Sequence, residues 1–207
     1  MKIEKIKIDG KKDSIEVMDS IVSGKINKKL VEAVLYKTNS NYKGRKAKTK
    51  QKNEIIGSTS KIYAQKGTGG ARHARRKAPL FVGGGVAHGP KGESSYKKRK
   101  LNKSEKKLSI ASLISEKNKY NNLLIFDDFE NKIKKTKEMN KFLKKYEAIN
   151  SLVVLDKTSK ENILRSAKNI PNVKITDVNH FSAFDIAKYK KLIFTESSIK
   201  ELEKRYS

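Results

Sequence analysis

The sequence contains no cysteine and no tryptophan, and only three prolines among its 207 residues. Without cysteine, disulfides and thiolate metal sites are excluded. No apolar run reaches the roughly 20 residues that a membrane-spanning helix needs. The opening residues, MKIEKIKIDG, alternate apolar and charged side chains and lack the apolar centre of a signal peptide. We therefore expect a cytoplasmic protein.

Negative charge is also scarce, because 49 Lys and Arg stand against 22 Asp and Glu, giving a net charge of +27. A dense polyanion would neutralise this excess, so nucleic acid is the first expected partner and an anionic membrane the second. Lysine supplies 42 of the positive charges, and AT-rich codons favour lysine. The position of the charges is therefore more informative than their number.

Two parts of the chain carry the periodic patterns of folded structure. In the first 40 residues, Ile3, Ile6 and Ile8 predict one strand and residues 15–18 a second. Apolar residues at helical spacing, from Leu30 to Leu35, then predict a helix that ends near Asn39.

The second part, residues 104–207, alternates helical and strand patterns. It predicts strands over 123–126, 152–155, 173–178 and 192–194, and helices around 108–114, 139–146, 159–167, 184–189 and 198–202. Ser159 is the expected N-cap of one helix, and Ser198 with Glu201 has capping-box spacing in the last. This alternation predicts an α/β fold: a single three-layer domain with a mainly parallel sheet and helices on both faces.

The interval between these parts differs in composition. Residues 41–107 hold 20 Lys and Arg against three Glu, with ten of the 12 glycines and five of the seven arginines. Only eight of its residues are Ile, Leu, Val or Phe. Ordering each residue costs about 1–2 kcal/mol, and these few side chains cannot offset that cost. We expect a folded domain, 1–42 plus 101–207, interrupted by a long basic extended loop, 43–100, that orders on a partner.

The stretch YAQKGTGGARHARRKAP, residues 63–79, lies near the middle of this loop, with an expected tip near 65–72. Glycine lets the backbone approach a surface closely, and the neighbouring cations can neutralise phosphates. Three aromatic residues, Tyr63, Phe81 and Tyr96, either stack on bases or pack on the folded domain. The candidate RNA-binding residues are Arg45, Lys46, Lys48, Lys50, Lys66, Arg72, His73, Arg75, Arg76, Lys77, Lys91, Lys97, Lys98 and Arg99.

Other interpretations of the same residues are weaker. The stretch GTGGAR fails the dinucleotide-binding fingerprint, because Arg72 stands in place of the third glycine and no strand precedes it. It could also be a plain flexible linker. A membrane-surface helix needs a helical period, which this segment lacks.

Carboxylates at strand ends leave an enzyme open as an alternative. Parallel sheets often place active sites or Mg²⁺ at that edge, but Asp is also common where strands end. The residues concerned are Asp127, Asp128, Asp156 and Asp177, with no metal-ligand spacing among His73, His88 and His180. We expect no metal, no cofactor, no small-molecule substrate and no enzymatic activity.

Residues 63–72 (YAQKGTGGAR), followed by GGGVAHGP at 83–90 and KLNK at 100–103, resemble the bacterial large-subunit ribosomal protein L-four family. The resemblance covers the whole chain. Four positions depart from the common pattern of the family: Tyr63, Ala64, Gly70 and Val82. A free nucleic-acid chaperone or DNA-binding protein is the second interpretation, and an α/β enzyme with a basic insertion the third.

The resemblance implies a structural constituent of the large subunit that binds its ribosomal RNA, assists subunit assembly and stays ribosome-bound in the bacterial cytoplasm. It also implies an α/β domain on the outer surface of the subunit. The loop would run through the RNA to the nascent-peptide exit tunnel and form a constriction there with ribosomal protein L-twenty-two. The tip residues that it implies are Gln65, Lys66, Gly67, Thr68, Gly69, Gly70 and Ala71.

Overall fold

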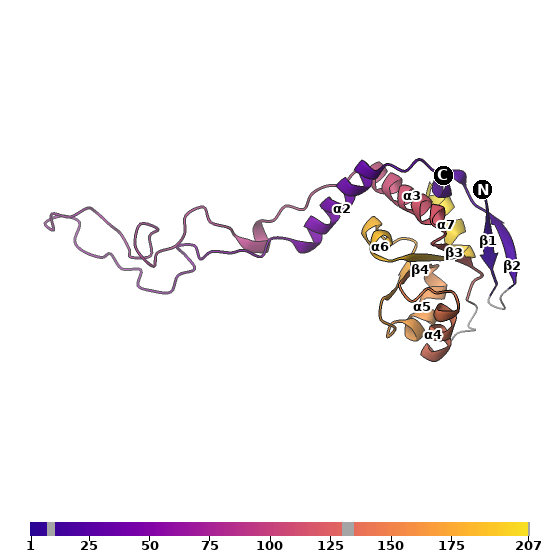
Figure 1. The fold of residues 1–207 in the computed structure, drawn as a ribbon. Helices are drawn as coiled ribbons and strands as arrows, with labels where there is room; N and C mark the ends of the chain where they lie inside the picture. Colours follow the sequence, from indigo (N-terminus) through magenta and orange to yellow (C-terminus); the bar gives the residue numbers. More distant parts are fainter. Residues whose placement is uncertain (8–10, 130–134, 207) are drawn as a thin grey trace. The chain divides into compact units, whose positions relative to one another are not determined.

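The computed structural model describes residues 1–7, 11–129 and 135–206 (Figure 1). The chain divides into two compact units, which we call unit 1, Met1–Asn39 with Lys100–Ser207, and unit 2, Ser40–Arg99. Within the described ranges, no helix combines the length and apolar character needed to cross a membrane.

Unit 1 is built on a six-stranded sheet with the order β2-β1-β3-β6-β4-β5. Its strands are β1 (Lys2–Ile6), β2 (Lys12–Glu16), β3 (Leu123–Phe126), β4 (Ser151–Leu155), β5 (Val173–Asp177) and β6 (Lys191–Thr195). The β1–β2 pairing is antiparallel, and the pairings of β1 with β3, β3 with β6, β6 with β4 and β4 with β5 are parallel. The α/β class is therefore confirmed, with a mixed sheet.

Seven α-helices accompany the sheet in the described parts of the chain: α1 (Asp19–Val22), α2 (Lys28–Lys43), α3 (Lys103–Lys119), α4 (Thr136–Lys145), α5 (Lys157–Ala167), α6 (Ala183–Lys188) and α7 (Glu196–Tyr206). Local side chains begin several of them. At α6 the Ser182 hydroxyl accepts from the Asp185 N–H over 3.3 Å, and the Asp185 carboxylate accepts from the Ser182 N–H over 3.4 Å. This reciprocal pair satisfies two amides that the first turn leaves free.

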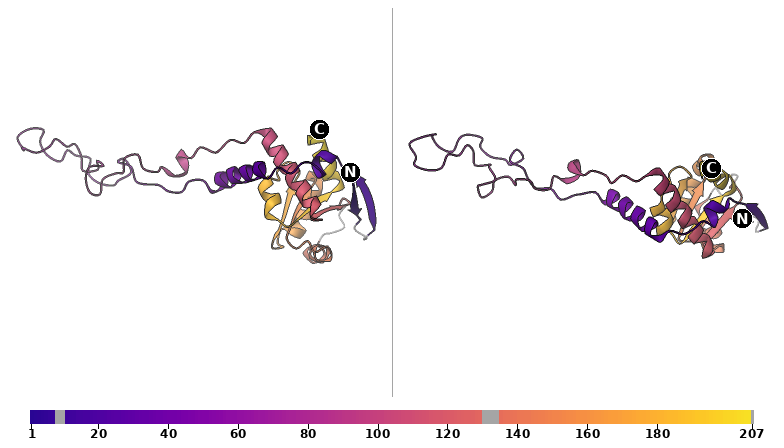
Figure 2. Two further views of the ribbon diagram at one scale, coloured as in Figure 1. Left: turned by 45° about the horizontal axis from the view of Figure 1, so that its top comes forward. Right: turned by 90° about the horizontal axis from the view of Figure 1, so that it is seen from above.

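Successive residues of each central strand enter different hydrophobic clusters. In β4, Leu152 and Val154 belong to one cluster, and Val153 and Leu155 to the other. Helices α1, α2, α3, α6 and α7 contribute to the first cluster, and α4 and α5 to the second. In Figure 1 α3 and α7 lie on one side of the sheet and α4 and α5 on the other, and Figure 2 gives two further views. Burial on both faces explains why these strands are unbroken apolar runs.

The predicted second strand, 15–18, is wrong in position. The strand β2 runs from Lys12 to Glu16, because the register pairs Ile6 with Lys12 and Lys2 with Glu16. This strand is a mostly exposed edge strand, and its residues are mainly polar. A prediction based on apolar residues therefore did not locate it. The short α1 follows and was not predicted. The predicted strand residue Ile8 lies outside the described residues.

Both predicted serine caps are also wrong. Helix α5 begins at Lys157, so Ser159 lies inside it. Helix α7 begins at Glu196, and the Ser198 hydroxyl accepts from the Thr195 N–H over 2.9 Å. Ser198 therefore reaches back to the residue before the helix, as the third helical residue of a capping box does. Only this half of a capping box forms, because the buried Thr195 Oγ1 has no hydrogen-bond partner among the described residues. The helix begins at Glu196 because β6 passes into α7 without a loop.

Candidate nucleic-acid interface

Unit 2 contains two chain segments that run side by side in opposite directions. Backbone bonds join 47–50 to 86–92: Gly92 N–H donates to the Ala47 carbonyl over 2.9 Å, Thr49 to Pro90 over 2.9 Å and Val86 to Lys50 over 3.0 Å. Lys48 and Lys91 form an antiparallel bridge. Farther along, the Ile62 N–H donates to the Ala74 carbonyl over 3.0 Å. We call residues 43–62 and 74–98 the arms and 65–72 the tip.

Two glycines of the GGG stretch let backbone segments meet where no side chain fits. A Cβ at Gly84 would lie 1.9 Å from the Ala78 carbonyl oxygen, and one at Gly85 would lie 2.3 Å from the Lys52 nitrogen. The Gly85 N–H also donates to the Lys77 carbonyl over 3.1 Å. Gly85 therefore allows the two arms to approach one another closely, whereas Gly84 allows the second arm to fold closely on itself at Ala78.

The tip glycines serve a different purpose. Gly67 and Gly69 have φ values of 89° and 67°, in the left-handed region that other residues rarely occupy, and a Cβ there would meet nothing within 4 Å. The tip therefore turns through backbone conformation in open space. All its residues are exposed, and the Ala71 carbonyl accepts a hydrogen bond from the Tyr63 hydroxyl.

The aromatic residues of unit 2 make contacts of their own. His73 lies edge-on between two of them, with ring centroids 6.4 Å from Tyr63 and 4.9 Å from Phe81. The Tyr96 hydroxyl instead donates to the Ser40 carbonyl over 2.9 Å. Tyr63, His73 and Phe81 thus form a small cluster within unit 2, and their stacking on bases stays a prediction.

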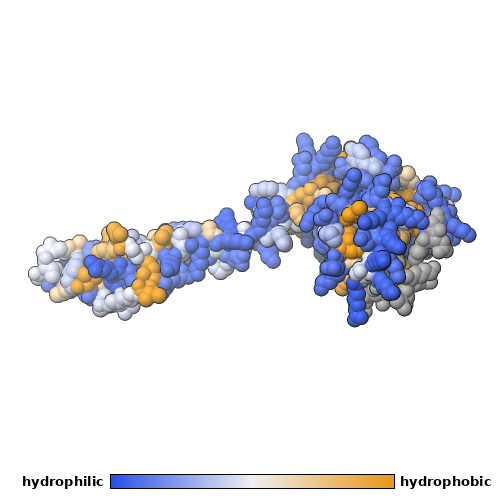
Figure 3. Space-filling model, turned by 60° about the horizontal axis from the view of Figure 1, so that its bottom comes forward, coloured by the Kyte–Doolittle hydropathy of each residue, from blue (hydrophilic) through white to orange (hydrophobic). Residues whose placement is uncertain are grey.

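The predicted RNA-binding residues lie mainly on the surface of unit 2. Three of them, His73, Arg75 and Lys77, are half-buried, and the remainder are exposed. A cleft of ≈ 350 Å³ brings Lys61, Gln65, Arg72, His73 and Arg75 together. Figure 3 shows blue, pale and orange areas mixed on the surface of unit 2. Its exposed large apolar side chains include Ile56, Leu80 and Val82.

Acidic residues compensate little of this charge, because unit 2 has 16 Lys and Arg and two Glu. Glu54 lies 2.7 Å from the Lys48 ammonium and accepts from the Gln51 N–H over 3.1 Å. The Lys48 ammonium, and then the Gln51 N–H, hold the pKa of Glu54 below its usual range. The arms therefore present cations to solvent, and a polyanion matches them.

A side-chain contact that sequence reasoning missed joins the two ends of unit 2. The Asn41 amide donates to the Arg99 carbonyl over 2.8 Å and accepts from the Arg99 N–H over 2.7 Å. No local pattern signals a pairing across 58 residues. The contact brings the first and last residues of the basic segment together.

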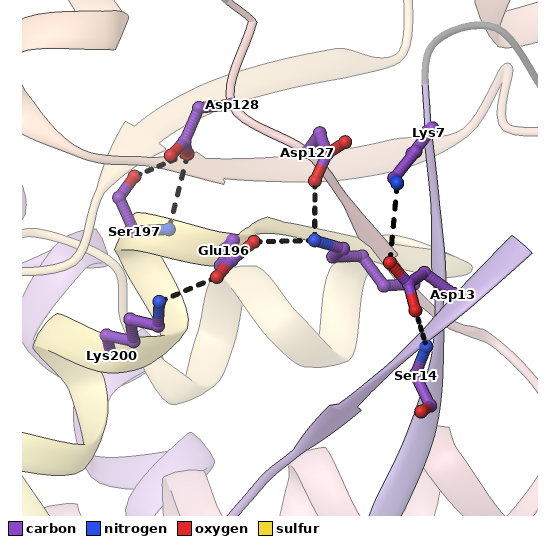
Figure 4. Close-up of polar contacts among 9 residues, drawn as sticks. Lys7, Asp13, Ser14, Asp127, Asp128, Glu196, Ser197 and Lys200 are labelled. Atoms are coloured by element: carbon purple, nitrogen blue, oxygen red, sulfur yellow. Dashed lines mark hydrogen bonds and ion pairs between the residues drawn. The ribbon is translucent and has the colours of Figure 1, made fainter. Parts of the chain in front are cut away.

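The strand-end carboxylates that suggested an enzyme have partners inside unit 1, and Figure 4 shows two of them, Asp127 and Asp128. The Lys5 ammonium, on a side chain that is 13% exposed, lies 2.8 Å from Asp127 and 2.7 Å from Glu196. Hydrogen bonds to Asp127 and then Glu196 raise the pKa of Lys5. The ammonium groups of Lys200 and then Lys5 lower the pKa of Glu196.

The remaining carboxylates of that edge have protein partners as well. Asp128 accepts from the Ser197 N–H over 3.2 Å and from its hydroxyl over 2.6 Å. Asp177 lies 2.6 Å from Nδ1 of His180, and Asp156, which follows β4, is half-buried. Among the described residues, no group of three or more His, Asp or Glu side chains could hold a metal ion. These contacts tie strands to helices, as structural ion pairs do.

An α/β unit and a cationic, glycine-containing pair of arms define a basic α/β protein with a candidate nucleic-acid interface. Residues 15–205 match the family described as Ribosomal protein L4/L1, and the chain belongs to this family. The predicted resemblance is thus confirmed. Because the family consists of ribosomal structural proteins, the chain is not an enzyme.

Individual relatives agree along nearly the full length. The chain is 78% identical over 207 residues, covering 100% of both, to Large ribosomal subunit protein uL4 of Pelagibacter ubique (strain HTCC1062). It is 35% identical over 190 residues to the protein of that name from Desulforapulum autotrophicum, covering 91% of this chain and 90% of the relative. It is 32% identical over 202 residues to the protein of the same name from Lachnospira eligens, covering 97% of this chain and 96% of the relative.

Proposed function

We propose that this chain is a structural constituent of the large ribosomal subunit in the bacterial cytoplasm and binds large-subunit ribosomal RNA through unit 2. The observation that carries the proposal is the cationic surface of unit 2, with 16 Lys and Arg against two Glu, on closely paired arms. RNA phosphates neutralise such a surface and release counterions. The relatives, each named Large ribosomal subunit protein uL4, support the same assignment.

Within this proposal, the arms supply affinity. Most of the predicted RNA-binding cations belong to residues 43–62 and 74–98, and contacts to phosphate fix position without reading sequence. Tyr63 and Phe81, which lie beside His73 and are half-buried, are the residues of this cluster that we propose stack on unpaired bases. Residues 43–100 order fully when RNA neutralises them, and this ordering assists subunit assembly.

The tip supplies shape instead of charge. After Gln65 and Lys66, residues 67–71 are three glycines, a threonine and an alanine, so they expose backbone with little bulk. A narrow aqueous passage is lined best by such residues, because they leave room for a moving chain. We propose that the tip lines the nascent-peptide exit tunnel beside ribosomal protein L-twenty-two.

Co-sedimentation tests the assignment. Tagged full-length chain, expressed in bacteria, should migrate with large subunits in a sucrose gradient and remain there after a high-salt wash. Crosslinking on these subunits should join residues 65–71 to a stalled nascent peptide and residues of the arms to ribosomal RNA. A chain that the wash removes, and that binds DNA and RNA equally, would instead be a free nucleic-acid chaperone.

A further inference from the structure

Unit 1 carries a groove that the proposed RNA contacts of unit 2 do not use. Its volume is ≈ 710 Å³, and it lies between the segment Lys25–Leu30 and one side of α3. Four apolar side chains, Ile26, Leu30, Leu108 and Tyr120, contribute to its floor. Leu108 is 59% exposed and Tyr120 is 65% exposed, so the groove presents adjoining apolar side chains to solvent.

The groove has room because one residue of α3 that lines it, Ser112, has a small side chain. Ser112 lies one helical turn after Leu108, is 5% exposed and lines the groove. A larger side chain there would fill the space between the segment and the helix. Its hydroxyl donates to the Lys25 carbonyl over 3.4 Å, and the Asn27 side chain accepts from the Leu30 N–H over 3.2 Å. These hydrogen bonds fix the segment Lys25–Leu30, which forms the side of the groove opposite α3, so the groove is preformed for binding.

The rim of the groove is cationic. It comprises Lys25, Lys28, Lys29 and Lys119, all exposed. In the part of the chain that the structure describes, none of these four ammonium groups forms an ion pair, although Glu116 also lines the groove. An occupant must therefore offer apolar side chains to the floor and negative charge to the rim.

We propose that this groove binds a short, acidic, amphipathic helix of another protein. Helices bind such grooves through apolar residues spaced at i, i+3 or i+4 and i+7. The aliphatic floor favours a protein segment over RNA, because base recognition relies on aromatic and arginine stacking. This groove has one aromatic residue and no arginine. A second copy of this chain is disfavoured, since each copy carries +27.

A designed pair of labelled peptides tests the proposal on the full-length chain. The first has about 14 residues, roughly four turns, with leucines on one face and glutamates elsewhere. The second has the same composition in an order that scatters the leucines. Both peptides carry the same charge, so a difference between their affinities, measured by fluorescence anisotropy, shows that the arrangement of leucines is recognised. We expect the amphipathic peptide to bind roughly tenfold more tightly at physiological salt.

Substitutions then locate the site. Leu108→Ala with Tyr120→Ala should remove most of that difference and leave the scattered peptide unaffected. The matched control is Ile149→Ala with Leu164→Ala, which truncates two apolar residues that are 49% and 38% exposed outside the groove. Methyl chemical shifts of Ile26, Leu30 and Leu108 in the unmutated chain provide a readout that does not depend on any variant folding. They should move with the amphipathic peptide alone.

Three results would overturn the proposal. Equal affinity for the two peptides would show that only charge is recognised. Methyl shifts that move elsewhere in unit 1 would place the peptide at another surface. If the Leu108 and Tyr120 pair weakened binding of a uridine oligoribonucleotide and left the peptide unaffected, the groove would be an RNA site. Ribosomal co-sedimentation of the same variants is expected to be unchanged, which separates this test from that of the proposed function.

Discussion

The side chain of Asn41 spans both backbone groups of Arg99, donating to its carbonyl over 2.8 Å and accepting from its N–H over 2.7 Å. One residue earlier, the Ser40 carbonyl accepts from the Tyr96 hydroxyl over 2.9 Å. The basic segment therefore starts and ends at one fixed point within unit 2. Arms that share a fixed origin lose less conformational entropy when a partner orders them.

Replacing Asn41 by alanine should loosen this closure. Both hydrogen bonds to Arg99 are lost, and each is worth about 1 kcal/mol. Amide exchange at Arg99 should accelerate roughly tenfold or more, because local opening becomes easier. Hydrogen exchange read by NMR on the full-length chain measures this. Asn53→Ala, at an exposed asparagine of the arms, is the control, and equal acceleration in both variants would contradict the assigned role.

Replacing Gly85 by alanine should separate the arms. The new Cβ would lie 2.3 Å from the Lys52 nitrogen and 2.7 Å from the Gln51 carbonyl carbon, so backbone must move. The bond from the Val86 N–H to the Lys50 carbonyl, 3.0 Å, should weaken, and its amide protection should fall. At Gly70 a Cβ would come no closer than 3.9 Å to its nearest neighbour, so Gly70→Ala is the matched control. Unchanged protection in Gly85→Ala would mean that close approach is not needed.

The arginines at the end of the tip and just after it should contribute to the salt dependence of RNA binding. Alanine at Arg72, Arg75 and Arg76 removes three cations, so the log–log slope of affinity against salt should flatten by about two to three units. Titration of a large-subunit ribosomal RNA fragment at several salt concentrations gives the slope. The control removes three exposed lysines of α4, Lys137, Lys141 and Lys144, with the same change in net charge. Equal flattening in both variants would show that total charge alone matters.

Glu196 should make the folded state of unit 1 sensitive to acid. Because Lys200 and Lys5 hold the pKa of Glu196 below its ordinary 4.5, its contribution is fully present above 4.5. The contribution is lost as the pH falls through the depressed value, where the folded carboxylate takes up its proton. At neutral pH, Glu196→Gln should lower the free energy of unfolding by about 1.5–3 kcal/mol. The difference from the unmutated chain should shrink progressively below pH 4.5.

Urea unfolding at a series of pH values checks this difference. The control is Glu16→Gln, because Glu16 lies 3.6 Å from Lys2 and both side chains are at least 74% exposed. Exposed pairs of this kind contribute about 0–1 kcal/mol, so this variant should differ little at any pH. A pH-independent loss in Glu196→Gln would indicate lost packing and not a lost ion pair.

Several features of the chain could be predicted from local sequence. The apolar runs LLIF and LVVL marked β3 and all of β4 except its first residue, Ser151, because strands buried on both faces are apolar at nearly every position. The concentration of glycine and arginine in residues 41–107 predicted the candidate interface from composition alone. Apolar runs and local composition are properties of residues that are neighbours in the sequence, so they can be recognised without knowing the fold.

Tertiary structure decided what distant residues do together. The polar edge strand β2 is a strand only because β1 pairs with it, and Lys5 meets Asp127 and Glu196 only because β1, β3 and β6 end at one edge of the sheet. The closure of Asn41 on Arg99 joins positions 58 residues apart. These contacts depend on which segments the fold brings to one place, and no local pattern of side chains carries that information.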